Sequence, residues 1–142
     1  DIIHPAPVIG LCGLAGIIAV SIAGCFAYYP EPKEALEELR VASIESQVAA
    51  ISGNSELCLH WIPMCEGWNK RLIVGIYLRN WTVDEDLLAV SKQLATELEA
   101  MEHMFQHRSF PSAVRRQALA VDDARRDLAN TLRRTGMIDS SQ

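Results

Sequence analysis

Residues Val8 to Tyr29 read VIGLCGLAGIIAVSIAGCFAYY, a run of 22 residues without a charged side chain. An α-helix of that length is about 33 Å long, and the hydrocarbon core of a bilayer is about 30 Å thick. Tyr28 and Tyr29 fall where such a helix would leave the hydrocarbon, and amphipathic aromatic rings prefer that depth. Pro30 and Pro32 oppose a continuing helix, because proline lacks the backbone donor. The run therefore predicts a membrane-spanning helix, with residues 1–30 as the anchor.

The predicted spanning helix carries a face of small residues. Alanine recurs at every fourth position beside a second row that contains glycines, and the face comprises Ala15, Gly16, Ala19, Ala23, Gly24 and Ala27. In lipid, helices associate through close backbone approach, which small side chains permit. We expect this face to contact partner helices in the membrane.

A lipid-modified cysteine is the alternative for this segment. The run Ile22 to Cys25 resembles a bacterial lipobox, which would make Cys25 the first residue of a mature lipoprotein. A signal peptide of that kind has a basic region before its apolar core. The sequence has no Lys or Arg before the run, which favours the spanning helix.

Residues 31–142 are expected to form one small helical domain outside the membrane. The formal net charge is −5, with acidic residues in excess over 30–107 and arginine in excess over 108–142. The basic end is interleaved with aspartate and contains a single aromatic residue, Phe110, for base stacking, so a nucleic-acid partner is not expected.

Several helical patterns predict the fold class, which is all-α with an antiparallel bundle of three or four helices after the anchor. Helices are expected over 32–52, 71–80, 82–107 and 111–134, and the short 107–111 connection implies antiparallel neighbours. In the first of these, a 3-4-3 spacing gives an apolar stripe that could pack in a bundle or form a short coiled coil: Val41, Ile44, Val48 and Ile51. The 82–107 helix has two seam rows, and only Ser91 breaks their apolar character.

Residues 55–70, SELCLHWIPMCEGWNK, are expected to form a loop because Pro63 and Gly67 oppose a continuous helix. The segment is nevertheless strongly apolar. It could cap the bundle, contact the membrane surface or dock onto a partner, since Trp and Met are enriched at interface centres. The residues predicted to bind a partner are Trp61, Ile62, Met64 and Trp68.

Cys58 and Cys65 bracket part of this segment and are predicted to form a disulfide. A disulfide persists in an oxidising space, so the domain is expected in a periplasm or an intermembrane space. A soft-metal group made by these two cysteines with His60 and Met64 is the alternative.

His103 and His107 lie one helical turn apart and could present both imidazoles to one metal ion. Against this stands a solvated helix end, where histidine suits the negative terminus of the helix dipole. No further ligand completes a familiar pattern, and no cofactor is expected.

No phosphate-binding loop, nucleophile elbow or dinucleotide fingerprint occurs, so an enzyme is not expected. The primary hypothesis is a single-pass membrane protein that acts as a non-catalytic accessory or assembly subunit of a larger membrane complex, for instance an energy-transducing one. Its protein partners would bind the spanning helix and the Trp-rich segment. The alternatives are a membrane-anchored periplasmic metal-binding or sensor protein and an envelope tether that forms a homo-oligomeric coiled coil.

Overall fold

The computed structural model describes residues 28–140 of the chain. Within that range the chain forms four helices: α2 (Pro32–Ile51), α3 (Ser55–Asn80), α4 (Glu85–Gln106) and α5 (Pro111–Arg134). The predicted all-α bundle is therefore confirmed for this part, with four helices. The predicted spanning helix lies outside the described residues except for Tyr28 and Tyr29. None of the helices described over 28–140 combines the length and apolar character needed to cross a bilayer.

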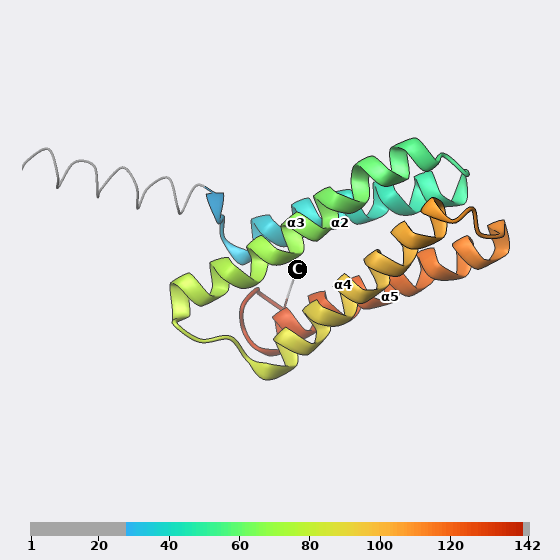
Figure 1. Cartoon of the computed structure of the whole chain (residues 1–142). Helices are drawn as coiled ribbons and strands as arrows, with labels where there is room; N and C mark the ends of the chain where they lie inside the picture. Colours follow the sequence, from blue (N-terminus) through green and yellow to red (C-terminus); the bar gives the residue numbers. More distant parts are fainter. Residues whose placement is uncertain (1–27, 141–142) are drawn as a thin grey trace, which may run out of the picture.

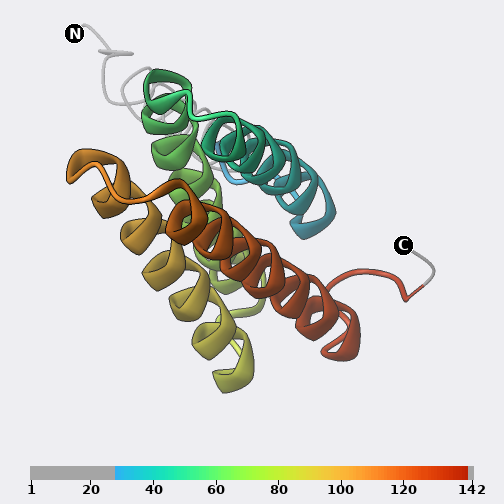
Figure 2. The same ribbon diagram turned by 90° about the vertical axis from the view of Figure 1, so that its right-hand side faces the viewer.

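The four helices pack as two antiparallel hairpins, α2–α3 and α4–α5 (Figure 1). Contacts run in a ring, from α2 to α3, α3 to α4, α4 to α5 and α5 back to α2. Figure 2 shows the α4–α5 hairpin lying against the α2–α3 hairpin. Short connections enforce this order, as expected for antiparallel neighbours. The α2–α3 turn contains Gly53 at a φ of 73°, a left-handed conformation that glycine adopts without a steric cost.

The core face of α2 is made of small residues rather than of the predicted stripe. Its buried positions recur with a 4-3-4-3 spacing at Ala35, Leu39, Ala42, Ser46 and Ala49. Small side chains let α2 lie close to α3, whereas the β-branched residues Val41, Val48 and Ile51 stay exposed. Periodicity showed that α2 has an apolar stripe but did not show which stripe faces the bundle.

The predicted loop over 55–70 is wrong, because these residues are the first part of the continuous helix α3. Six buried positions follow a 4-3-4-3-4 spacing along the whole helix: Cys58, Ile62, Cys65, Asn69, Leu72 and Ile76. Burial of this face offsets the cost of Pro63 inside the helix, about 3 kcal/mol in an ordinary helix interior. Asn54 caps the start, since its side chain accepts a hydrogen bond from the Leu57 amide at 3.1 Å. The helix predicted over 71–80 is confirmed as the end of α3.

The predicted helices over 82–107 and 111–134 are confirmed as α4 and α5. Asp84 caps the start of α4, because its side chain accepts a hydrogen bond from the Asp86 amide at 2.9 Å. The buried residues of α4 are Leu87, Leu94, Leu98 and Met101, which belong to the predicted seam. Pro111 begins α5 at a position where its missing donor costs nothing.

Candidate docking surface

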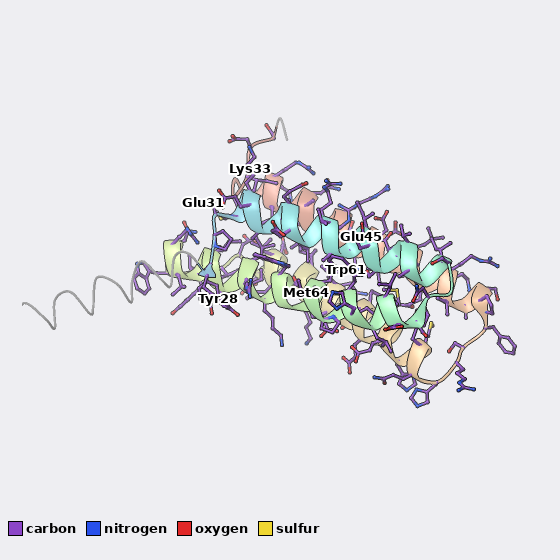
Figure 3. The ribbon with its side chains drawn as sticks, turned by 90° about the horizontal axis from the view of Figure 1, so that it is seen from above. Tyr28, Glu31, Lys33, Glu45, Trp61 and Met64 are labelled. Carbon is purple, nitrogen blue, oxygen red and sulfur yellow. The ribbon has the colours of Figure 1, made fainter. Side chains whose placement is uncertain are left out.

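An apolar row runs along the outer side of α3, next to α2. We name it the α3 stripe, and it consists of Leu57, Trp61, Met64 and Trp68. The 4-3-4 spacing brings these side chains onto one face of the helix. Leu57 and Met64 are exposed to 48% and 45%, and the two tryptophans lie partly buried against the core. Figure 3 looks onto the α2–α3 hairpin and shows Trp61 and Met64 on this outer side, with Glu45 on the neighbouring helix.

A second apolar row lies on the outward face of α2. We name it the α2 seam, and it consists of Val41, Ile44, Val48 and Ile51. Val48 and Ile51 are exposed to 58% and 57%, although both are large β-branched apolar residues. Exposed apolar rows that gather on one face are typical of interaction sites, whereas single exposed apolar residues are not.

The α3 stripe ends at an arginine that lies between two aromatic rings. The guanidinium carbon of Arg71 lies 4.0 Å from the centre of the Tyr28 ring and 4.6 Å from the centre of a Trp68 ring. Such contacts combine cation–π attraction with planar stacking. Tyr28, the last residue but one of the apolar run, is therefore held on α3 at the end of the stripe.

The next residues of the chain are held on the same helix. Arg79 donates a hydrogen bond from Nη2 to the Tyr29 carbonyl at 2.7 Å, and its Nε lies 3.5 Å from Glu31. Gly75 lies directly beneath this segment, because a Cβ there would be in van der Waals contact with the Pro30 oxygen and the Tyr29 Cβ, at 3.5 Å from each, and 3.2 Å from Arg79 Nη1. We name this attachment of Tyr28–Glu31 to α3 the clamp.

Three of the four residues predicted to bind a partner lie on the α3 stripe: Trp61, Met64 and Trp68. The fourth, Ile62, does not, because it is fully buried in the core. Leu57 was not predicted as part of the surface, and the α2 seam was predicted only as a stripe that could pack in the bundle or form a short coiled coil. The sequence did not indicate that the helix continues through Pro63. Leu57 could therefore not be grouped with Met64, because only a continuous helix brings the two onto one face. The predicted membrane face, from Ala15 to Ala27, lies outside the described residues.

The predicted disulfide is wrong, because Cys58 and Cys65 are free thiols buried in the core. Seven residues of helix separate them by about 10.5 Å, and a disulfide requires Cα atoms within about 7 Å. Burial raises the pKa of the Cys58 thiol to about 11, and burial followed by the charge of Glu66 raises the pKa of the Cys65 thiol to about 12. Both are packing residues, so they no longer support placing the domain on an oxidising side.

The two histidines of one candidate metal group lie together, whereas the residues of the other group are divided between the surface and the core. His103 and His107 stack with ring centres 3.9 Å apart, and His107 Nδ1 lies 3.0 Å from the His103 carbonyl oxygen. His60 is exposed and packs edge-on against Trp61, whereas Cys58 and Cys65 point into the core. Over residues 28–140, no three His, Cys, Asp or Glu side chains gather in an arrangement that could hold a metal ion.

An acidic groove lies between α3 and α4 and has a volume of about 480 Å³. Glu66, Glu99 and Glu102 line it together with His103. Burial, followed by the charge of Glu102, raises the pKa of the Glu66 carboxyl. The groove thus places like charges together, and Lys70, which also lines it, partly opposes the rise in the pKa of Glu66.

The outer face of the α2–α3 hairpin carries residue types found in protein interfaces. It presents tryptophan, methionine and branched aliphatic side chains, the residue types that dominate the centres of such interfaces. The clamp places this surface directly beside the end of the apolar run. No known protein family, no characterised protein and no solved structure matches this chain.

Proposed function

We propose that this protein is a single-pass membrane protein that acts as a non-catalytic accessory or assembly subunit of a larger membrane complex. In this role the apolar run anchors the chain, and the helical bundle presents a docking surface beside the membrane. The observation that carries the proposal is the α3 stripe, a row of Trp, Met and Leu left partly in water on the outside of a closed core.

The stripe offers binding energy that the bundle itself does not use. Burying a large apolar side chain contributes about 1.5–3 kcal/mol, and Leu57 and Met64 still have roughly half of that gain available. Tryptophan adds a large rigid surface at a small cost in side-chain entropy, as at known binding hot spots. A partner that covers this row would therefore gain several kcal/mol without unfolding any part of the bundle.

The clamp supports a partner that is itself in the membrane. Tyr28 is the last residue but one of the apolar run, and it contacts Arg71 on the same helix that carries the stripe. If the run spans the bilayer, Trp68 lies within one helical turn of the point where the chain leaves the membrane. The docking surface would then start at the membrane surface and extend away from it along α3.

The test is to purify the full chain from its native membrane in mild detergent. We expect wild type to migrate as part of a larger complex, and Met64→Glu to migrate alone because a buried charge opposes docking. Leu119→Glu is the matched control, since Leu119 is an exposed apolar residue on α5. Migration of the wild-type chain only as a lone monomer would contradict the proposal, as would equal loss of the complex in both variants.

A further inference from the structure

The α2 seam has the residue pattern of a helix that pairs with a copy of itself. We propose that α2 packs in parallel against α2 of a second copy of this chain through Val41, Ile44, Val48 and Ile51. The inference deepens the proposed function by naming one partner, and its parallel orientation rests on the proposed membrane anchor. The charge pattern beside the seam supports the same orientation independently.

The seam follows the heptad rule that coiled coils use. Val41 and Val48 occupy a positions, Ile44 and Ile51 occupy d positions, and the spacing is 3-4-3. The buried residues of α2, such as Ala42 and Ser46, fall on the b, c and f positions instead. The helix therefore has two separate faces, one that closes the bundle and one that remains unpaired over residues 28–140.

Charged residues flank the seam with opposite signs on its two sides. In a parallel pair, each g residue lies near the e residue five positions later on the other helix. Lys33 and Arg40 occupy g positions, and Glu38 and Glu45 occupy the matching e positions. Both pairs of this register, Lys33 with Glu38 and Arg40 with Glu45 of the second copy, are attractive.

An antiparallel pair centred on the same seam is disfavoured. It would place Glu45 opposite Glu45 of the second copy, because e positions then face each other. Arg40 bonds to Glu37 on its own helix at 2.6 Å in the single chain, so pairing requires it to share or exchange that partner. Both side chains are exposed, and exposed ion pairs of this kind contribute little to stability. The free-energy cost of exchanging the partner of Arg40 is therefore small.

The size of the seam makes the pairing dependent on the membrane. Four apolar residues fall short of the roughly 800 Å² per partner that a stable complex in solution buries. Glu34 and Glu37 occupy the two seam positions before Val41, so the apolar contact cannot extend towards the start of α2. Two chains anchored in one bilayer are parallel and confined, which raises their effective concentration. A contact too weak in solution becomes sufficient there.

The first arm of the test uses cysteine cross-linking of the full chain in lipid vesicles. Cys12 and Cys25 are replaced by Ala, while Cys58 and Cys65 remain because their thiols are buried. Val48→Cys places a thiol on the seam, and Leu119→Cys places one on α5 as the matched control. We expect mild oxidation to give a covalent dimer with Val48→Cys and at least tenfold less with Leu119→Cys. Equal yields would overturn the proposal.

The second arm tests the register in the Val48→Cys background. Arg40→Glu or Glu45→Arg places like charges across the pair and should lower the dimer yield about tenfold. Combining the two substitutions restores an attractive pair between positions 40 and 45 on each side of the dimer, and it should restore the dimer yield. Failure of the combined variant to recover, with helicity unchanged, would overturn the parallel register.

The same samples separate this inference from the proposed function. Retention of the chain in carbonate-washed vesicles reports the anchor alone. A retained chain without a seam cross-link would reject self-association and leave the accessory-subunit proposal standing, whereas a chain washed off the vesicles would count against the anchor itself.

Discussion

Asn69 on α3 and Ser91 on α4 hold each other in a reciprocal pair of hydrogen bonds. Asn69 Nδ2 donates to the Ser91 carbonyl at 2.9 Å, and Ser91 Oγ donates to Asn69 Oδ1 at 2.9 Å. Asn69 is 3% exposed, so its amide has little access to water. Ser91 interrupts the apolar seam of α4 because it completes the partners of a buried amide. The pair fixes the lengthwise position of α3 against α4, since sliding either helix would break both bonds.

Removing one member of this pair should cost more than removing both. Ser91→Ala leaves the buried Asn69 oxygen without a partner, and we expect the free energy of unfolding to fall by about 1–3 kcal/mol. Asn69→Leu combined with Ser91→Ala removes both polar groups and should recover most of that loss. Chemical denaturation of the single and double variants measures this difference. Additive losses in the double variant would show that the two side chains act independently.

Pro63 should be a weak point of α3 rather than a functional hinge. It cannot donate to the Leu59 carbonyl, so Pro63→Ala restores one backbone bond in an exposed part of the helix, and we expect a gain of about 1–3 kcal/mol. Pro111→Ala is the matched control, because Pro111 stands in the first turn of α5, and a change within about 0.5 kcal/mol is expected. Thermal unfolding compares the two. A destabilised Pro63→Ala variant would show that the bundle requires the local geometry of proline.

The acidic groove should make the bundle more stable in mild acid. Burial and then Glu102 raise the pKa of Glu66, so the folded state binds its proton more tightly than the unfolded state does. This stabilising contribution is fully present below the unfolded pKa and is lost as pH rises through the folded pKa. Glu66→Gln should therefore raise stability at neutral pH and flatten the pH dependence between about pH 4 and 7. Unfolding midpoints measured across that range test the sign, and an unchanged slope in the variant would contradict it.

The clamp should depend on the missing side chain at Gly75. A Cβ there would already lie 3.2 Å from Arg79 Nη1, so Gly75→Leu should displace Tyr28–Glu31 from α3 and leave the core intact. Chymotrypsin cleavage after Tyr28 should then become several-fold faster. Gly67→Leu is the matched control, because nothing lies within 4 Å of a Cβ at Gly67. Equal cleavage of the two variants would show that the clamp does not protect this segment.

The sequence predicted the helices whose signals were local and failed where packing decided. Pro111 predicted the start of α5, and the predicted ends of α4 and α5 lie within one residue of the observed ends, whereas α4 begins three residues after its predicted start. The loop prediction over 55–70 failed because Pro63 and Gly67 were given more weight than the regular spacing of the buried residues. That spacing was hard to recognise, because the row includes a polar residue, Asn69, and two cysteines that had been assigned to a disulfide. The true core of α2 was missed for a similar reason, since its alanines and serines are less hydrophobic than the seam residues.

The candidate surface was predicted only in part for the same physical reason. Composition identified Trp61, Met64 and Trp68 as residues suited to an interface, and that inference did not require a loop. It could not separate them from Ile62, because the difference between surface and core here is one helical position. The exposure of Val48 and Ile51 depends on which side of α2 the other helices occupy, and no local pattern carries that information.

The clamp also gives the bundle the mechanics of a lever. Tyr28–Glu31 is held on α3 by several contacts and does not form a flexible linker. A tilt of the chain at Tyr28 would therefore tilt α3, and the helices packed on it, by a similar angle. Leu57 lies about 21 Å from Arg71 along α3, and a tilt of about 10° would carry it roughly 4 Å sideways. If the apolar run spans a membrane as proposed, small changes in the inclination of the chain there would be enlarged at the far end of the candidate surface.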